Sequence, residues 1–317
     1  MATVSGQLKD ASINGKPRDL MDMIFNVSPT DTPFLTMCGK TKAIQTLHEW
    51  QTEDLAAPGA NSQLEGADVT TFEEVTSEEL SNKTQILRKS INVSKTAQAV
   101  KQAGVGKQYA HQMALKTKEI KKDLEFALLS NQIQASESGS NPRKMRGLPA
   151  WLKTNVSLGA SGAVATTSAA ATAGTTRVPT EAMLKDALTK IYNEGGNCDR
   201  IMLAPSMRVK FSEILTGGAT KMEKAEAKKA HAVIDVYVSD FGTLKLVPNR
   251  VQGGVTYSQN CAFILDPDYW KVAYLRGFQE NKLAQTGDSD KGYIICEATL
   301  EARQEKSSGM IADLKIA

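Results

Sequence analysis

Long apolar runs and cysteines are scarce in this sequence. No stretch of the 317 residues approaches 18 consecutive apolar residues, so we expect no membrane-spanning helix. Residues Met1–Asp10 are polar and lack the apolar core of a secretory signal, which predicts a chain that is not exported. Few and widely spaced cysteines indicate reduced thiols in a cytoplasm. The cysteines are Cys38, Cys198, Cys261 and Cys296.

A strong excess of one charge is also absent. The 38 Lys and Arg residues nearly balance the 35 Asp and Glu residues, whereas a dedicated nucleic-acid-binding domain is strongly basic. The charge is nevertheless unevenly distributed. Residues 49–79 are acidic and contain no Lys or Arg, whereas residues 116–122 and 221–229 are rich in Lys. Complementary patches of this kind favour association of the chain with copies of itself.

The motifs that carry catalytic chemistry are incomplete. Gly104–Lys107 resembles the end of a phosphate-binding loop, but it lacks the first glycine and the Mg²⁺-ligating hydroxyl. His48–Glu49 lacks the second histidine of a zinc-protease motif. Asp240–Gly242 matches a kinase triplet without the other kinase motifs, so it predicts a hairpin turn. We therefore expect no enzyme, no catalytic residue, no metal ligand and no cofactor.

The first third of the chain combines turns with extended segments. Residues 1–45 have the character of an N-terminal arm, in which a short helix over Asp19–Phe25 ends before two prolines. Leu47–Gln51 and Thr84–Ser94 have strand patterns and flank a polar loop. Residues 46–96 are too poor in apolar groups to form a core, so we predict that they form a projecting β-hairpin.

Residues 105–133 have the clearest helical pattern. Apolar residues recur there at helical spacing with Lys and Glu between them, which predicts one amphipathic helix roughly 43 Å long. The repeating residues are Val105, Tyr109, Met113, Ile120, Leu124 and Leu128. Gly147–Leu152 is predicted to be a short apolar anchor. Gly159–Thr176 consists almost entirely of Gly, Ala, Ser and Thr, and we expect it to be flexible or exposed.

Residues 180–255 have the pattern of a compact α/β domain, and residues 256–317 are rich in strands. Thr180 is predicted to cap a helix that ends at Gly195–Gly196. The other elements expected before residue 256 are a strand over Ile201–Ala204, a helix from Pro205, a polar helix over Met222–Ala232 and a hairpin of Val233–Val238 with Thr243–Val247. The later candidate strands are Ala262–Leu265, Trp270–Leu275, Tyr293–Thr299 and Met310–Leu314.

Short stretches along nearly the whole chain carry a resemblance to a known family. They are Ser28–Phe34, His48–Trp50, Glu65–Gly66, Asn82–Ile86, Val93–Ser94, Asp123–Glu125, Gly147–Leu148, Ser239–Gly242, Asn249–Arg250, Asp266–Pro267, Leu283–Asp290 and Glu297–Glu301. In this order they are similar to the major head proteins of tailed bacteriophages. The sequence of an arm, a long β-loop, a long helix, an α/β domain and final strands likewise resembles the Hong Kong 97-type capsid fold.

The resemblance implies an α+β fold and a structural function. The chain would be a major capsid protein that self-assembles as pentamers and hexamers into the icosahedral head around a double-stranded DNA genome. The implied divisions are an N-terminal arm (1–45), an E-loop over a neighbouring subunit (46–96), a peripheral domain (97–179) with the spine helix 105–133, an axial domain (180–255), and peripheral-domain strands with the C-terminus (256–317).

Copies of the chain itself are the main partners that the resemblance implies. Scaffolding, portal and decoration proteins are further expected partners, genome DNA would be met only by non-specific contact at the inner surface, and no membrane is involved. The protein would reside in the virion after assembly in the host bacterial cytoplasm. The residues expected at intersubunit contacts are Trp50, Glu53, Asp54, Glu73, Glu74, Lys116, Lys121 and Lys122.

Other functions remain as alternatives at this point. An encapsulin-like compartment shell would have the same fold, and an α/β enzyme of unknown class would need a pocket with perturbed titratable groups. A phage decoration or tail protein would lack this order of elements. Some relatives cross-link a Lys to an Asn with a catalytic Glu, but this trio cannot be placed on the sequence. A further hypothesis is that Gly159–Thr176 absorbs differences between pentamer and hexamer environments.

Overall fold

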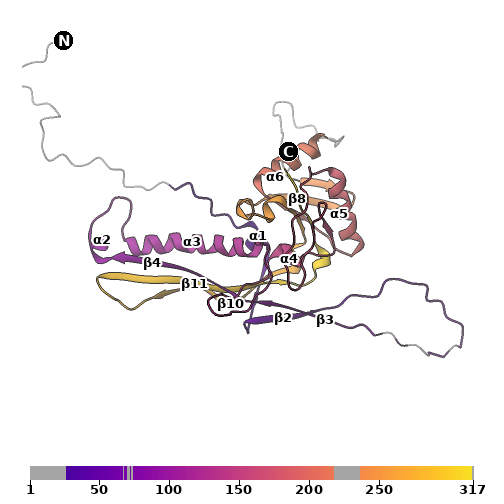
Figure 1. Ribbon diagram of the computed structural model, residues 1–317, viewed down its shortest axis with the longest axis horizontal. Helices are drawn as coiled ribbons and strands as arrows, with labels where there is room; N and C mark the ends of the chain where they lie inside the picture. The colour runs from indigo at the N-terminus through magenta and orange to yellow at the C-terminus, as the bar shows by residue number, and fades with distance from the viewer. Residues whose placement is uncertain (1–25, 67, 70–71, 73, 218–235, 316–317) are drawn as a thin grey trace, which may run out of the picture.

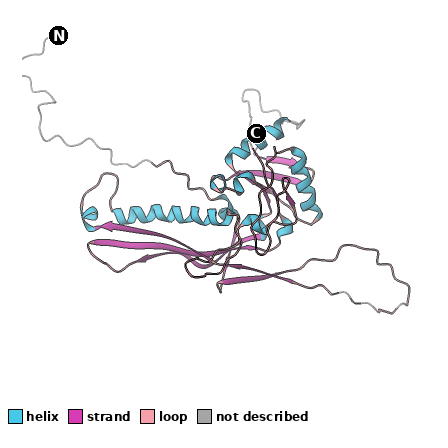
Figure 2. Ribbon diagram, viewed as in Figure 1, coloured by secondary structure: helices cyan, strands magenta, loops and turns pink. Residues whose placement is uncertain are grey.

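The protein consists of two lobes and a projecting hairpin (Figures 1 and 2). The computed structural model describes residues 26–66, 68–69, 72, 74–217 and 236–315. In the elongated lobe, one long helix lies along a four-stranded sheet. In the rounder lobe, helices pack on a six-stranded sheet. The hairpin and its long loop extend away from both lobes.

The elongated lobe is built from strands that are distant in the sequence. The sheet order is β1-β10-β11-β4, formed by Gly39–Lys42, Trp270–Lys282, Ser289–Ala302 and Gln85–Ser94. β10 and β11 form an antiparallel pair, β4 pairs antiparallel with the other edge of β11, and β1 runs parallel to β10. Two predicted strands, Trp270–Leu275 and Tyr293–Thr299, are thus confirmed but are longer than their apolar patterns.

The predicted amphipathic helix is α3, Gln108–Leu129. Ile120, Leu124 and Leu128 are fully buried against the sheet, as their spacing predicts. The helix begins later than expected because Gly104, at φ 76°, turns the chain and Val105 pairs with Gln102. Its 22 residues therefore span ~33 Å rather than the predicted length.

The rounder lobe contains a sheet whose two faces serve different cores. Ile201 and Ile264 face the helices α5 (Glu181–Asn193) and α6 (Pro205–Gly217), whereas Phe263 on the other face joins the core around α3. Because one sheet contributes to both cores, the two lobes are packed together. The sheet order is β5-β12-β9-β6-β8-β7, formed by Val156–Ser157, Gly309–Ile311, Ala262–Leu265, Arg200–Leu203, Gly242–Pro248 and Val236–Ser239.

Short helices complete the fold. α4 is the predicted apolar anchor and is completely buried. α1 directly follows the prolines of the arm and was not predicted, although Pro is well suited to the first turn of a helix. The short α-helices are α1 (Pro33–Met37), α2 (Lys95–Ala99) and α4 (Leu148–Trp151), and the 3₁₀-helices are η2 (Gln252–Gly254), η3 (Ser258–Asn260), η4 (Pro267–Tyr269) and η5 (Glu305–Ser307).

Several local predictions in the second half are confirmed. The Thr180 hydroxyl accepts a hydrogen bond from the Met183 amide, 3.4 Å away, at the start of α5. Gly195, at φ 85°, ends the same helix in the left-handed region that favours glycine. β6, β8 and α6 lie where their patterns place them. The helices predicted over 19–25 and 222–232 lie outside the described residues.

The predicted pairing of the hairpin was wrong. β2, Leu47–Thr52, pairs with β3, Glu78–Lys83, and the strand predicted to return beside it is β4, which pairs with β11 instead. Ile91 and Val93 of β4 pack into the core of the elongated lobe, where their apolar side chains are removed from water. β3 was missed because its sequence is polar and acidic.

The assignment of the last strands to one domain also needs correction. β10 and β11 lie in the elongated lobe, but β9 and β12 lie in the six-stranded sheet. The chain crosses between the two sheets twice after residue 256. A buried apolar strand has the same local pattern in either sheet, so the sequence alone does not distinguish them.

The segment 159–176 is mostly exposed, as predicted, but part of its backbone is held against the rest of the fold. The buried carboxylate of Asp313 accepts hydrogen bonds from the amides of Gly159, at 2.9 Å, and Gly174, at 2.8 Å. A Cβ atom on Gly159 would lie 2.1 Å from the carbonyl oxygen of Thr175. The small residues therefore permit close backbone packing.

This close packing predicts the effect of one added methyl group. Gly159→Ala should lower the free energy of unfolding of the soluble subunit by about 1–3 kcal/mol, because the backbone of Thr175 must move. Gly59→Ala is the matched control, since nothing lies within 4 Å of a Cβ atom there, and it should change stability little. Chemical denaturation followed by circular dichroism measures both. Equal stabilities of the two variants would contradict the packing described.

Candidate assembly interface

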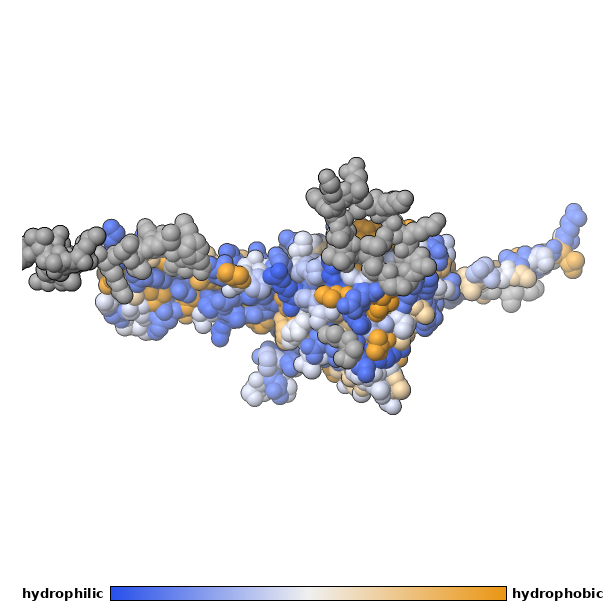
Figure 3. Space-filling model, turned by 90° about the horizontal axis from the view of Figure 1, so that it is seen from above, coloured by the Kyte–Doolittle hydropathy of each residue, from blue (hydrophilic) through white to orange (hydrophobic). Residues whose placement is uncertain are grey.

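The loop between β2 and β3 exposes apolar side chains. We call residues 53–77 the projecting loop; it extends beyond both lobes (Figures 1 and 3). Leu55, Leu64 and Phe72 are 91%, 84% and 83% exposed. Exposed large apolar residues clustered on one segment mark a surface that binds another molecule. The projecting loop thus has the composition of an interface that is incomplete in a single chain.

The base of the hairpin, in contrast, is firmly attached to the body of the protein. The indole Nε1 of Trp50 donates to the carbonyl oxygen of Ala302 at 2.8 Å, and its ring centroid lies 5.4 Å from that of Trp151. The side chain of Asn82 is fully buried and donates to the carbonyl of Leu300 at 2.7 Å. It also accepts from the amide of Arg146 at 2.7 Å. These bonds fix the direction in which the projecting loop leaves the body.

A charged group at the base adds to this attachment. Glu301 accepts from Nε2 of His48 at 3.0 Å and from Nε of Arg303 at 2.8 Å. Burial raises the pKa of the Glu301 carboxyl, but the hydrogen bonds and charges of Arg303 and His48 outweigh burial and hold the pKa below its ordinary value. The ionised carboxylate therefore joins β2 to the end of β11.

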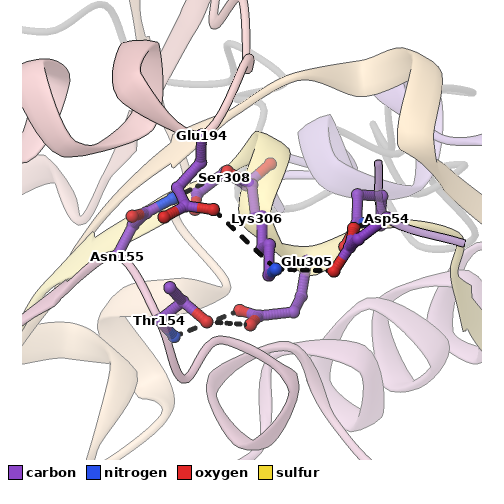
Figure 4. Close-up of polar contacts among 8 residues, drawn as sticks. Asp54, Thr154, Asn155, Glu194, Glu305, Lys306 and Ser308 are labelled. Carbon is purple, nitrogen blue, oxygen red and sulfur yellow. Dashed lines mark hydrogen bonds and ion pairs between the residues drawn. The ribbon is translucent and has the colours of Figure 1, made fainter. Parts of the chain in front are cut away.

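A second polar cluster holds Asp54, near the start of the projecting loop (Figure 4). Lys306 of η5 donates to the carboxylate of Asp54 at 2.6 Å, and Gln304 donates to the same carboxylate at 2.8 Å. The Lys306 ammonium also lies 3.8 Å from Glu194, at the end of α5. Beside it, Glu305 accepts from the amide of Lys153 at 3.0 Å. The rounder lobe is thereby connected to the projecting loop.

The buried carboxylate of Glu125 joins three parts of the fold. It accepts from the amides of Phe34, at 2.8 Å, and Leu35, at 2.7 Å, in α1. It also accepts from the amide group of Asn249, at 2.7 Å, just after β8. Burial raises the pKa of Glu125, although these three donors partly oppose the increase. The start of the chain, the long helix and the rounder lobe therefore meet at one side chain.

Groups suited to catalysis are not assembled in the described part of the chain. No cluster of three His, Cys, Asp or Glu side chains among these residues could hold a metal ion. All four cysteines are free thiols, and burial raises the pKa of each, that of Cys296 to about 12. Such thiols are protonated at neutral pH and are poor nucleophiles. Within the described ranges, no helix is long and apolar enough to span a membrane.

A comparison with known protein families agrees with the order of elements and with the exposed apolar side chains of the projecting loop. The model of the SU10 major capsid protein family matches residues 3–315. The chain belongs to this capsid protein family. The family match covers the arm, both lobes and the hairpin, so it applies to the whole architecture rather than to one domain.

Individual capsid proteins are similar along the same length. The major capsid protein of Escherichia phage Phieco32 is 28% identical, with 94% of each chain covered. A structure of the cyanophage A-1(L) capsid asymmetric unit aligns with a TM-score of 0.65 at 11% identity, covering 96% of this chain and 98% of that one. The predicted α+β, Hong Kong 97-type fold is confirmed.

One similar structure is not from a phage. The holo-SrpI encapsulin complex of Synechococcus elongatus PCC 7942 contains a chain that aligns with a TM-score of 0.58 at 9% identity, covering 98% of this chain and 97% of that one. At this identity the likeness concerns the fold alone. The family match and the curated phage relative favour the phage capsid protein over a compartment shell.

The residues predicted at intersubunit contacts lie in three different settings in this capsid protein. Trp50 and Asp54 have partners within their own chain, as described above. Lys116 pairs with Glu119 one turn away at 2.8 Å. The remaining described residues of the set, Glu53, Glu74, Lys121 and Lys122, reach solvent, and Glu73 lies outside the described residues.

The most connected polar residues of the capsid protein were missed by the sequence reasoning. Asn82, Glu125 and Glu297 are each at most 2% exposed, and Glu297 accepts from Thr84 and Arg276, both at 2.8 Å. One signal was available for Glu125. It directly follows Leu124 on the face of the helix pattern that is otherwise apolar, where an unpaired charge would be costly.

Removing the charge of Glu125 should make the subunit less stable. Glu125→Gln leaves one of the amides in α1 facing an NH₂ group, so the free energy of unfolding should fall by about 1–3 kcal/mol. Asp123→Asn is the matched control on the same helix, because Asp123 is partly exposed and its ion pair with Lys89 is worth little. Thermal unfolding of the soluble subunits compares them. The proposed junction is contradicted if the two variants unfold alike.

The lowered pKa of Glu301 predicts a specific pH dependence. Its contribution to stability should be present above the ordinary glutamate pKa of 4.5 and should disappear as the pH falls through the lower pKa of the folded state. The difference in unfolding free energy between the native chain and Glu301→Gln should therefore shrink below about pH 4.5. Denaturation at several pH values measures this. A difference that grows on acidification would refute the ionised state of Glu301.

Proposed function

We propose that this protein is the major capsid protein that builds the icosahedral head of a tailed bacteriophage as pentamers and hexamers around double-stranded DNA. The observation that carries the proposal is the projecting loop, which has a fixed base and exposed apolar residues without a partner in the described chain. A neighbouring subunit supplies that missing partner. Family membership and the shared fold support the same function.

The parts of the molecule have separate tasks in this proposal. The hairpin within residues 46–96 is the E-loop, which lies over a neighbour. The spine helix and the four-stranded sheet form the peripheral domain, which carries the continuous wall. The rounder lobe, built on residues 180–255 and extended by β9 and β12, is the axial domain that meets its copies at the symmetry axes. The arm of residues 1–45 adds a further contact.

We assign the intersubunit contacts to those predicted side chains that have no hydrogen-bond or ion-pair partner among the described residues of their own subunit. Glu53 and Glu74 on the projecting loop, and Lys121 and Lys122 on the outer face of α3, face other subunits. Trp50 and Asp54 orient the loop and do not themselves cross the interface, since their partners lie within the subunit. Many such contacts, each weak, make a closed shell stable through multivalency.

Assembly in the host bacterial cytoplasm and placement in the virion complete the proposal. Scaffolding, portal and decoration proteins are further partners, and DNA is met at the inner surface without sequence recognition. The near balance of charge supports weak contact with DNA, because strong binding requires a basic excess. As a structural protein, the chain has no catalytic step to perform.

A compartment shell is the second candidate, favoured only by the likeness to an encapsulin complex. The two functions differ in what the shell encloses. Shells isolated from infected cells should contain double-stranded DNA in the first case and protein cargo in the second. Digestion with nuclease and mass spectrometry of the contents decides between them.

Purified recombinant protein should form closed shells or ring-shaped capsomers that are visible by electron microscopy. Replacing residues 55–76 with a short Gly-Ser turn should leave the circular dichroism spectrum and solubility of the subunit unchanged, because none of the residues described in this segment belongs to either core. The same change should abolish closed shells. The matched control is Gly59→Ala, which keeps the loop. Normal shells from the shortened chain would refute the role given to the projecting loop.

A further inference from the structure

The guanidinium of Arg146 is a buried cation without an acidic partner. Only 6% of the residue is exposed, whereas arginine is seldom buried to this extent unless it is paired. In the part of the chain that the structure describes, Arg146 belongs to no ion pair, and its buried Nε atom has no hydrogen-bond acceptor. Burial lowers the pKa of Arg146, and no charge among the described residues opposes this effect. An unpaired charge in such a place is costly.

The buried acids of β11 are already paired with other bases. Glu297 accepts from Nε of Arg276, and Glu301 accepts from Nε of Arg303, both at 2.8 Å. The side chains of the two acids are at most 5% exposed, so they too require the partners that they have. Because these carboxylates are engaged, the described residues of a single subunit supply no counter-charge to Arg146. Its counter-charge must therefore come from another molecule.

Arg146 is also held firmly in its place. The side chain of Asn82 binds its backbone twice, because Oδ1 accepts from the Arg146 amide at 2.7 Å and Nδ2 donates to the Arg146 carbonyl at 3.2 Å. The guanidinium carbon lies 4.8 Å from the ring centroid of Trp151. This stacking attracts the cation but gives its N–H groups no acceptor oxygen. The guanidinium therefore cannot turn out to water without breaking these contacts.

The chemistry of the guanidinium restricts what can bind to it. A guanidinium has N–H donors and no acceptor, so its ligand must be an anion that accepts hydrogen bonds. Two neighbouring N–H groups of arginine match two oxygens of a phosphate or a carboxylate. The indole Nε1 of Trp151, which is buried and has no acceptor among the described residues, is a further donor in the same stack. Because so little of Arg146 reaches the surface, a small anion fits there and a polymer such as DNA does not.

We propose that Arg146, stacked on Trp151, is the binding site of a small oxyanion of the phosphate class. The anion neutralises the buried guanidinium and accepts hydrogen bonds from it. The stack continues to Trp50, whose ring centroid lies 5.4 Å from that of Trp151, so the anion also stabilises the base of the hairpin. This inference goes beyond the proposed function, because it concerns a ligand of each subunit rather than assembly of the shell.

Calorimetric titration of the purified full chain with inorganic phosphate, in a chloride buffer, tests this site. Phosphate should bind the native chain with a Kd of about 1 mM or lower, and Arg146→Met should weaken binding at least about tenfold, because the fork of donors is lost. The matched control is Arg88→Met, which removes an exposed arginine and should leave the Kd unchanged. Equal binding by the native chain and Arg146→Met, or no binding by the native chain, would overturn the inference. Competition by a short DNA duplex would overturn the assignment to a small anion.

Thermal unfolding separates anion binding from simple packing of Arg146 on Trp151. In chloride, Arg146→Met should unfold at a temperature at least as high as the native chain, because an unpaired buried charge is removed. Adding 50 mM phosphate should raise the Tm of the native chain by about 2 °C or more and that of Arg146→Met by less than about 0.5 °C. An equal loss of Tm by the variant in both buffers would show that Arg146 acts only through packing, and the inference would fail.

The native chain provides a further test that needs no variant. Electron-microscopy maps of the protein in phosphate and in chloride should differ by density for one small anion within hydrogen-bond distance of the Arg146 guanidinium. Density in phosphate only at exposed lysines and arginines would identify an adventitious ion and contradict the site.

Discussion

The buried carboxylate of Glu125 is the interaction on which the arrangement of the whole molecule depends. An ionised group in a protein interior is tolerated only when its oxygens are paired, and here the partners come from α1 and from the residue that follows β8. The start of the chain, the long helix and the rounder lobe are therefore held in one fixed relation. Angles between subunits in a closed wall depend on such a relation within each subunit.

In the hairpin, polar and apolar groups lie in the reverse of their usual environments. Its base contains buried polar atoms that are bonded to the body, such as those of Asn82, whereas its tip exposes apolar side chains to water. A rigid base combined with an exposed apolar tip favours tight binding, because the base loses little conformational freedom when the tip binds its partner. The direction of the loop is thus determined before assembly begins.

Local physical chemistry made much of the fold predictable. The periodicity around Ile120 and Leu124, the cap at Thr180 and the apolar run of β9 each specify an element through neighbouring residues. Sheet membership is different, because it depends on contacts between distant residues. β3 is polar and pairs only because β2 lies beside it, and β12 resembles a strand of either sheet. The exposure of the small residues after Gly159 was predictable from their composition, but the hydrogen bond to Asp313, far along the chain, was not. The exposed tip and the acidic stretch were predictable from composition, but the contacts that attach the base of the hairpin to the body were not.

The acidic stretch of residues 49–79 contains no Lys or Arg, and this one-sided composition has a consequence for subunits before they meet correctly. Two projecting loops carry the same sign of charge and repel each other within about 8–10 Å at moderate ionic strength. Their apolar tips are thereby kept from clustering tip to tip, which would yield amorphous precipitate. The segment that makes the correct intersubunit contact thus also disfavours contact between two loop tips. Concentrated salt screens this repulsion and should therefore weaken it.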